Sequence, residues 1–317
     1  MKINIENYEI AVLIPCFNEA KTIGKVIDDF SKVLPSSKIY VYDNSSTDST
    51  STIAKRHGAI VYKEPFKGKG NVVKRMFADI QADIYVLVDG DATYDANSLI
   101  KMIEELFSNN YDMVVGSRIP INKELAYRAG HIIGNKFLTK FVSMLFGGNL
   151  KDMLSGYRVF SRRFVKTFPI LSRGFEIETE ITIHTLQIGA SYSELETPYY
   201  ARPEGSHSKL NTYKDGSKIL RQILMLLKNE KPLFFFGFIS LGFFIVSIMI
   251  FIPILISFLE TGLVLKVPSL LLSVSLMIVA FLSFTSGIIL DNIRVFKQEY
   301  KRSNYLRFSS LRIGSNK

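Results

Sequence analysis

Two carboxylates separated by a glycine form the sharpest chemical signal in the chain. Asp89, Gly90 and Asp91 follow an apolar run of residues. Carboxylates at i and i+2 of a turn can face one divalent cation. Oxygen ligands of this kind suit Mg²⁺ or Mn²⁺, which often bridge carboxylates to substrate phosphates. The alternative is a solvated turn, in which Gly90 serves the tight backbone alone.

Two further polar loops carry residue types suited to a nucleotide. Asp43 opens a loop rich in Ser and Thr, and it can accept hydrogen bonds from a nucleoside base. It can equally cap the next helix, a role also open to Thr47 or Asp48. Lys69 lies in the run Lys-Gly-Lys-Gly at residues 67–70, which can cradle a diphosphate or form a solvated turn, and whose spacing is not that of a P-loop.

These loops must be positioned by the elements that precede them. Short β-rich runs alternate with stretches of helical spacing, which predicts βαβ units and a parallel sheet. In open sheets of this class, ligands bind beyond the carboxyl ends of the strands, and the polar loops all follow predicted strands. The predicted strands are residues 10–15, 38–42, 59–62, 84–88 and 112–115, with another near 194–200, and the predicted helices are residues 20–34, 47–57, 70–82 and 97–108.

The last third of the chain has a different composition. Of the 317 residues, 47% are hydrophobic, but the apolar residues are concentrated. Residues 233–258 and 267–290 contain no charged side chain. Each run exceeds the roughly 20 residues that cross a bilayer as a helix, so the sequence argues against a fully soluble protein. Buried core helices are the alternative.

The charge distribution predicts how these spans are oriented. The formal net charge is +10, and residues 291–317 hold seven Lys or Arg against two acidic residues. Residues 213–231 are also basic, whereas the link between the spans is neutral. This pattern predicts a hairpin in the cytoplasmic (inner) membrane, with both termini and the large domain in the cytoplasm. The basic flanks favour anionic lipid headgroups over nucleic acid.

Smaller observations complete this outline. The single cysteine, Cys16, excludes an intramolecular disulfide and a Cys-rich metal site. Residues 1–8 have no apolar core, so we expect no cleavable signal peptide. Residues 213–230 have an apolar stripe, which indicates either a helix on the membrane surface or a core-facing helix. Small residues in the first span would let helices of several copies pack, so a homo-oligomer is a further expectation; they are Gly237, Ser240, Gly242 and Ser247.

Taken in order, the motifs resemble family 2 glycosyltransferases with the GT-A nucleotide-sugar fold. They are similar in particular to the polyprenyl-phosphate branch, which includes dolichol-phosphate mannose synthases and bacterial bactoprenol glucosyltransferases with two C-terminal spans. The resemblance covers roughly residues 9–295. The residues that carry it are Pro15-x-x-Asn18-Glu19, Asp43 to Asp48, Gly68-Lys69-Gly70, Asp89-x-Asp91, Asp152 to Arg158, Gly174-Phe175-Glu176 and Arg202 to Lys209.

The resemblance implies a role for each matching residue. Donor binding falls to Pro15, Asn18, Glu19, Asp43, Lys69, Asp89 and Gly90, with Asp43 at the base and Asp89 at the ribose and diphosphate. Asp91, with Asp89, would hold Mg²⁺ or Mn²⁺. The lipid phosphate would meet Arg118, Arg128, Arg202 and Lys209, and the catalytic set would be Asp89, Asp91, Asp152 and Arg118. Asp152 would orient the acceptor or the sugar, act as a weak base, or serve only to tie the Ser155–Arg158 loop by hydrogen bonds.

This chain departs from the family pattern at two positions. Relatives often have two acidic residues at the base, whereas here Tyr42 precedes Asp43. Ile132 occupies a position where relatives can supply a hydroxyl to the phosphate. The resemblance therefore implies one acidic contact to the nucleoside base, from Asp43, and no hydroxyl contact to the lipid phosphate at Ile132.

The implied architecture has four parts. Residues 1–212 form a cytoplasmic α/β domain of GT-A (Rossmann-like) type, and residues 213–231 form an amphipathic juxtamembrane helix. Residues 232–290 form two transmembrane helices, and residues 291–317 form a basic cytoplasmic tail.

The implied activity is inverting transfer of a sugar from a nucleotide-sugar, UDP-glucose first, to polyprenyl (undecaprenyl) phosphate. The lipid-linked sugar would serve cell-envelope glycan modification. GDP-mannose and UDP-N-acetylhexosamine are alternative donors. A processive polysaccharide synthase is disfavoured because the chain has no Trp for the Q-x-x-R-W motif and has two spans. A non-catalytic membrane scaffold is disfavoured by the intact carboxylates Asp89 and Asp91.

Overall fold

The computed structural model describes residues 5–121, 139–147, 150–174, 176–203 and 224–310. The chain divides into two compact units. The first holds the residues up to Thr212 together with the chain from Lys301, and the second is Tyr213–Tyr300. The first unit therefore includes residues 301–310, which the sequence had assigned to a separate tail.

The first unit is built on a seven-stranded mixed sheet with strand order β3-β2-β1-β4-β6-β5-β7. The predicted βαβ units are confirmed, but the expectation of a wholly parallel sheet is wrong. β6 runs antiparallel to both of its neighbours, β4 and β5. The strands are β1 (Ile10–Cys16), β2 (Lys38–Asp43), β3 (Ile60–Lys63), β4 (Ile84–Leu87), β5 (Met113–Pro120), β6 (Arg158–Ser161) and β7 (Tyr192–Tyr199).

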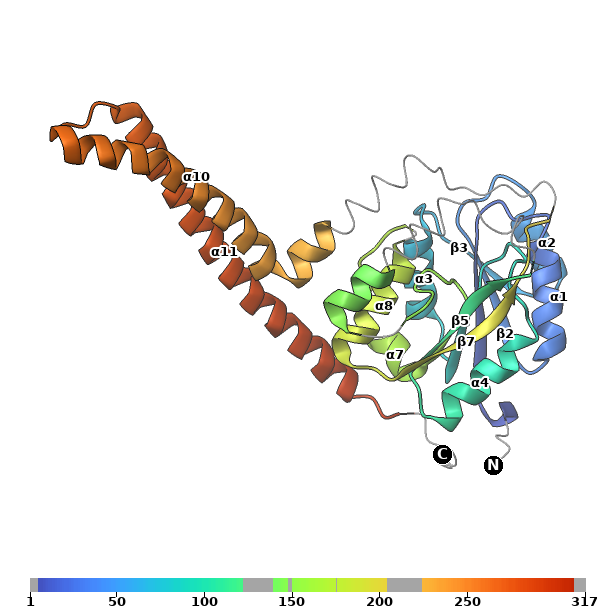
Figure 1. Ribbon diagram of the computed structural model, residues 1–317. Helices are drawn as coiled ribbons and strands as arrows, with labels where there is room; N and C mark the ends of the chain where they lie inside the picture. Colours follow the sequence, from blue (N-terminus) through green and yellow to red (C-terminus); the bar gives the residue numbers. More distant parts are fainter. Residues whose placement is uncertain (1–4, 122–138, 148–149, 175, 204–223, 311–317) are drawn as a thin grey trace. The chain divides into compact units, whose positions relative to one another are not determined.

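Helices cover both faces of this sheet, because its central strands are apolar on both sides (Figure 1). Along β1, Ile10, Val12 and Ile14 pack into one core, whereas Ala11 and Leu13 pack into the other. One face carries α1 (Ile23–Val33), α2 (Thr50–Arg56) and α4 (Ser98–Ser108), and the other carries α3 (Lys69–Asp79), α7 (Arg162–Thr167) and α8 (Ile177–Ile188).

The helix α1 shows why these segments are helical. Its buried residues Ile23, Val26, Ile27 and Phe30 recur at the spacing of one helix face. Burying this stripe against the sheet leaves the charged residues of the helix in solvent. The same pattern lets α1, α2, α3 and α4 be predicted to within a few residues of their ends.

The antiparallel strand β6 has a consequence for the site. Since β4, β5 and β7 run parallel, their carboxyl ends lie at one edge of the sheet. A strand of opposite direction begins at that same edge, so the loop before β6, residues 150–157, arrives beside the carboxyl ends of its neighbours. This loop holds Asp152, which follows no predicted strand.

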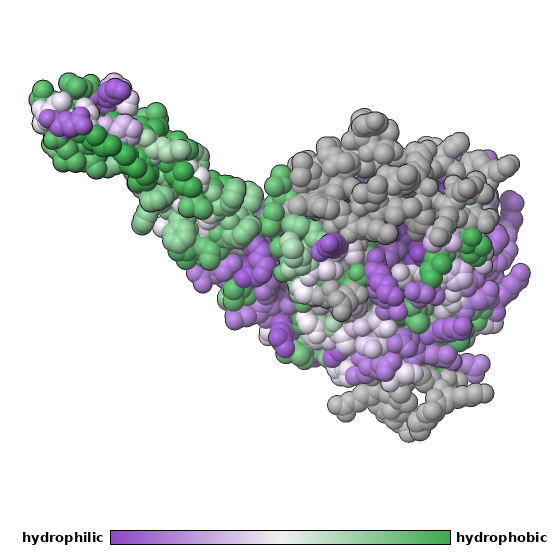
Figure 2. All heavy atoms as spheres, viewed as in Figure 1, coloured by the Kyte–Doolittle hydropathy of each residue, from purple (hydrophilic) through white to green (hydrophobic). Residues whose placement is uncertain are grey.

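The second unit contains two long apolar helices, α10 (Pro232–Thr261) and α11 (Val267–Leu306), except that the end of α11 from Lys301 belongs to the first unit. Both are long and apolar enough to cross a membrane, and only 11% of the most apolar window of each is buried. A core helix of a soluble protein would be mostly buried, so both helices are candidate membrane spans. Figure 2 shows that the surface of α10 and α11 is apolar along most of its length.

Serine hydroxyls join the two helices to each other. Ser247 donates to the Ser273 carbonyl at 2.8 Å, and Ser273 donates to the Ser247 carbonyl at 3.2 Å. Ser240 donates to the Ala280 carbonyl at 2.7 Å. Two of the small residues assigned to packing between copies therefore bond within one chain.

The helix α11 continues well past its apolar part. The second span was predicted to end at residue 290, but α11 runs unbroken to Leu306. Lys, Arg, Gln and Glu are good helix formers, so the polar segment extends the helix without extending the apolar span. Of the predicted juxtamembrane helix, residues 224–230 are helical, and residues 213–223 lie outside the described part.

Candidate active site

The polar loops gather at the carboxyl edge of the sheet, as the fold class predicts. The loops after β1, β2, β4, β5 and β7 lie there, together with the loop before β6. Among the described residues, three carboxylates of the predicted site have cationic partners at this edge: Asp89, Asp91 and Asp152. The sequence assigned the cations to substrate phosphates and predicted no partner for them within the chain.

Asp89 is held by a lysine that is itself shared. The Lys69 Nζ lies 2.5 Å from Asp89 Oδ1 and 2.5 Å from Glu178 Oε1. Burial alone would lower the pKa of Lys69, but the charges of Asp89 and Glu178 raise it above its ordinary value of 10.5. The ammonium is thus engaged with two carboxylates rather than presented as a simple diphosphate cradle.

Glycines make room for this arrangement. A Cβ on Gly156 would lie 2.5 Å from Asp89 Oδ2 and 3.1 Å from Lys69 Nζ. Gly68, at φ +125°, caps the start of α3, where a side chain would overlap the Arg173 carbonyl oxygen. Gly90 approaches the first strand so closely that a Cβ would lie 2.8 Å from Cys16 Sγ. Any side chain at Gly156 would push against the Asp89 carboxylate.

Asp91 is nearly buried, and each of its oxygens has a different partner. The Thr93 hydroxyl donates to Oδ1 at 2.6 Å, and Arg202 Nη2 lies 2.6 Å from Oδ2. Burial raises the pKa of Asp91 and the charge of Asp89 raises it further, while Arg202 lowers it. The predicted acceptor-phosphate arginine thus lies on the predicted metal ligand.

The donor set fits a divalent cation bound together with a substrate phosphate. The charge of Asp89 raises the pKa of Asp91, so a cation beside Asp91 would relieve the repulsion between the two carboxylates. The described residues contain no group of three or more His, Cys, Asp or Glu side chains arranged to hold a metal. Mg²⁺ commonly takes one or two carboxylates and completes its shell with phosphate oxygens and water.

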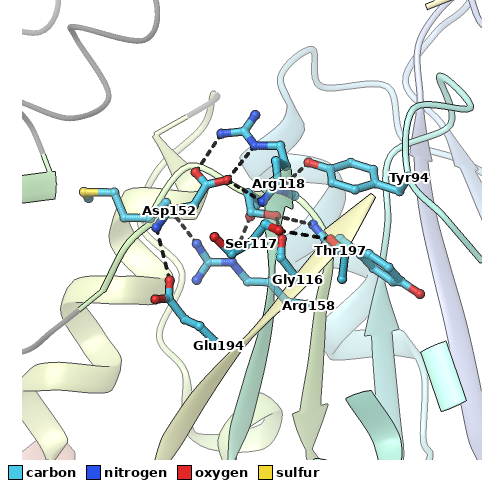
Figure 3. A network of polar contacts seen from close by, with 12 residues as sticks. Tyr94, Gly116, Ser117, Arg118, Asp152, Arg158, Glu194 and Thr197 are labelled. Atoms are coloured by element: carbon cyan, nitrogen blue, oxygen red, sulfur yellow. Dashed lines mark hydrogen bonds and ion pairs between the residues drawn. The ribbon is translucent and has the colours of Figure 1, made fainter. Parts of the chain in front are cut away.

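Asp152 and Arg118 form a bidentate pair (Figure 3). Arg118 Nε donates to Asp152 Oδ2 at 2.7 Å, and Nη2 donates to Oδ1 at 2.8 Å. The Arg118 backbone N–H also donates to Oδ2 at 3.2 Å. Both carboxylate oxygens are therefore already hydrogen-bonded, which favours the structural tie over the general base.

Buried polar groups hold the loop that carries Asp152. Glu194 accepts hydrogen bonds from the backbone N–H groups of Lys151 and Asp152, at 2.7 and 3.1 Å. Arg158 is fully buried and donates to the Ser155 carbonyl at 3.0 Å. Burial lowers the pKa of Arg158 to about 10, against the opposing charges of carboxylates that include Asp152. Figure 3 shows Glu194 and Arg158 beside the Arg118–Asp152 pair.

The first loop is tied to the second loop. Asn18, at φ +54°, accepts a hydrogen bond from the Thr47 backbone N–H at 2.8 Å. The Glu19 backbone N–H donates to Thr50 Oγ1 at 2.9 Å. Pro15, in β1, is aligned with Tyr42 of β2. These contacts give the first loop a role in shaping the edge of the sheet.

Asp43 is buried within its own loop. Its Oδ1 accepts a hydrogen bond from the Ser46 backbone N–H at 2.9 Å, and its Oδ2 accepts one from the Ser51 hydroxyl at 2.5 Å. These contacts stabilise the turn and the start of α2. This role resembles the helix cap that the sequence offered as the alternative for Asp43. The contact of Asp43 with a base stays a prediction.

Arg128, Ile132 and Lys209 lie outside the described residues. The structure adds three groups that sequence reasoning missed, namely Glu178, Thr93 and Glu194. Glu178 lies two residues after the Gly-Phe-Glu motif, but nothing local distinguishes it from other helical glutamates. Thr93, two residues beyond Asp91, could have been found as a side chain able to hydrogen-bond within the turn.

Comparison with known proteins identifies the family. Residues 11–168 match the sequence profile of Glycosyl transferase family 2. Glycosyltransferase AglJ of Haloferax volcanii is 35% identical over 74% of this chain and 76% of its own length. The chain belongs to glycosyl transferase family 2. This glycosyltransferase is also similar to Protein RfbJ of Shigella flexneri, at 55% identity over 39% of this chain and 97% of RfbJ.

Another relative and a solved structure add to the picture of this glycosyltransferase. A dolichyl-phosphate hexose transferase of Haloferax volcanii is 26% identical over 70% of this chain and 96% of its own length. The Mycobacterium tuberculosis glucosyl-3-phosphoglycerate synthase, crystallised with Mn²⁺, UDP and glucosyl-3-phosphoglycerate, superposes with a TM-score of 0.56. The match has 24% identity and covers 70% of this chain and 79% of that one, so it confirms the GT-A fold.

Proposed function

We propose that this glycosyltransferase moves a hexose, with UDP-glucose as the favoured donor, to the phosphate of a polyprenyl lipid such as undecaprenyl phosphate. One observation carries the proposal. Paired carboxylates and basic side chains share one edge of the sheet in a chain that also has two helices able to cross a membrane. The similarity to a dolichyl-phosphate hexose transferase supports a lipid-phosphate acceptor. The basic flanks of the hairpin support a catalytic unit on the cytoplasmic side.

The acceptor needs little activation in such a reaction. A lipid monophosphate is anionic at neutral pH, so it can attack the anomeric carbon without a strong general base. We therefore assign Asp152 to positioning. Its two oxygens fix the plane of the Arg118 guanidinium, whose remaining surface can meet the phosphate. Attack from the side opposite the leaving nucleotide inverts the anomeric centre.

The donor meets the other half of the site. Lys69 and Glu178 hold Asp89 in one orientation, toward the ribose and diphosphate in this proposal. A Mg²⁺ or Mn²⁺ ion bound by Asp89 and Asp91 would neutralise the charge that develops on the departing nucleoside diphosphate. Asn18 and Glu19 shape the loop on which the nucleoside would rest.

The proposal is tested with membranes that contain the full chain. They are incubated with radiolabelled UDP-glucose, UDP-N-acetylglucosamine or GDP-mannose, and lipids are then extracted. We expect label in a lipid-phosphate sugar from UDP-glucose, and its loss with EDTA or in Asp91→Asn. Asp95→Asn is the matched control, because Asp95 accepts a hydrogen bond from the Ser98 N–H at the start of α4 and Asn caps helices equally well.

The assay also separates the alternatives. Label from GDP-mannose or the N-acetylhexosamine donor alone would keep the lipid acceptor and correct the sugar. Label in a polymer would point to a processive synthase. No transfer from any donor, with nucleotide still bound, would point to a scaffold and would refute the proposal.

A further inference from the structure

We infer that the Arg202 guanidinium and the divalent cation compete for the same oxygen of Asp91. Binding of the cation then releases Arg202 to the substrate phosphates. This inference rests on the proposed function, because it needs a metal at Asp91 and a phosphate-bearing substrate. Arg202 would thus have two positions: paired with Asp91 before the metal binds, and beside the substrate phosphates afterwards.

The carboxylate of Asp91 is arranged so that one oxygen faces a cation. Thr93 occupies Oδ1 through its hydroxyl at 2.6 Å and its backbone N–H at 3.3 Å. Arg202 Nη2 lies 2.6 Å from Oδ2. The Asp91 side chain is 6% exposed, so a charged carboxylate here needs a cationic partner, which Arg202 supplies.

The backbone near Arg202 is joined to the turn that carries Asp91. The Tyr200 N–H donates to the Thr93 carbonyl at 2.8 Å, and Tyr94 forms a β-bridge with Tyr199. The end of β7 is thereby joined to the turn that carries Asp91. The Arg202 side chain is 31% exposed, in contrast to Asp91, so it can leave the carboxylate while this backbone connection stays in place.

The neighbouring charges explain why the divalent cation would replace Arg202 at Asp91 instead of binding beside it. Asp89, the second carboxylate of the pair, is already engaged by Lys69. A divalent ion at Asp91 would therefore lie near two cations, Lys69 and Arg202, and would repel both. Lys69 is 10% exposed and is held by two carboxylates, whereas Arg202 lies in the more accessible position. Arg202 is the cation that moves.

The diphosphate makes this exchange favourable. It supplies oxygen ligands to the metal, which two carboxylates leave unsaturated, and it supplies an anion to the released guanidinium. Metal and nucleotide should therefore bind with positive coupling, and the coupling must be reciprocal. Without nucleotide, the metal has to displace Arg202 with no new partner for the guanidinium.

The test measures Mn²⁺ affinity rather than turnover. Full-length protein in detergent is titrated with Mn²⁺, with and without UDP, while electron paramagnetic resonance follows the free ion. We expect Arg202→Gln to bind Mn²⁺ about tenfold more tightly than wild type without UDP, which corresponds to about 1.4 kcal/mol. With UDP the gain should shrink or reverse, so the UDP-dependent increase in affinity falls in the variant.

Two further variants sharpen the result. Arg202→Lys keeps the charge and should remain close to wild type. Lys151→Gln removes an exposed positive charge from the loop of Asp152 and should leave both affinities unchanged, which controls for net charge. Equal or weaker Mn²⁺ binding by Arg202→Gln without UDP, beside normal UDP-dependent binding in wild type, would overturn the exchange alone. Absence of Mn²⁺ binding to wild type with UDP would overturn the metal role as well.

Discussion

The shared lysine of the site offers a quantitative test of how the catalytic unit is held together. Lys69→Met removes the ammonium that lies 2.5 Å from both Asp89 and Glu178 and retains most of the apolar stem. The Glu178 side chain is 6% exposed, and the Asp89 side chain is 28% exposed. After the substitution, Glu178 is a buried carboxylate that has lost its cationic partner.

The expected loss of stability follows from that burial. Breaking a buried ion pair on one side costs about 3–5 kcal/mol, because the remaining charge is uncompensated. Asp89 can be solvated in part, so we expect about 3 kcal/mol, mostly from Glu178. For a domain of this size, the change corresponds to a fall in Tm of about 6–12 °C. Replacing both Lys69 and Glu178 with Met should restore most of the stability, since a hydrophobic pair of similar volume can replace a buried ion pair.

The assay is thermal unfolding of the full chain in detergent, followed by a signal from the catalytic unit. Lys67→Met is the matched control, because Lys67 is exposed, and it should shift Tm by less than about 2 °C. The pKa of Lys69 is raised above 10.5, so its contribution is fully present at neutral pH and is lost only as pH rises through the raised pKa in strong alkali. The difference between Lys69→Met and wild type should therefore be constant from about pH 6 to 9. A Tm equal to wild type in Lys69→Met, or a double variant no more stable than the single one, would refute the reasoning.

Three other predictions address separate features. Asp91→Ala should abolish transfer with little change in Tm, because in the proposed function the residue holds the metal and it is not a core contact; measurable activity in this variant would contradict its role as a metal ligand. Tyr305→Phe removes a hydrogen bond to Asp112 and should destabilise the catalytic unit by about 1 kcal/mol. Tyr300→Phe, at an exposed site, should not change the stability. Equal Tm values for the two variants would argue against the contact between Tyr305 and Asp112. Burial, helped by the charge of Lys301, lowers the pKa of His184 to about 3 from 6.5, so the neutral ring contributes stability that is lost as pH falls from 6.5 toward 3. His184→Leu should therefore lose less Tm than wild type between pH 6.5 and 4.5, and parallel pH curves would show that this imidazole does not titrate with unfolding.

Local pattern was enough to predict much of the fold. The helices α1 to α4 follow from apolar residues at helical spacing, because each helix buries one apolar stripe. The strands β1 to β5 follow from short β-rich runs between those helices. The two apolar helices follow from their length and lack of charge. The location of the polar loops follows from the rule that parallel strands present their carboxyl ends at one edge, which places Asp89, Asp91 and Arg118 together without any knowledge of contacts.

The ion-pair partners could not be predicted from the sequence, because they depend on contacts between segments that are distant in the chain. β6 is four residues long and starts with a charged arginine, so neither its existence nor its direction was predicted. Its antiparallel direction brings Asp152 to the edge of the sheet, where Arg118 binds both oxygens. The sequence could mark Lys69, Arg118 and Arg202 as cations for phosphates. Only the tertiary structure shows that each of these cations forms an ion pair with a carboxylate of the same site. The physical reason is that a carboxylate removed from water needs a compensating charge, and the fold places these cations next to the carboxylates.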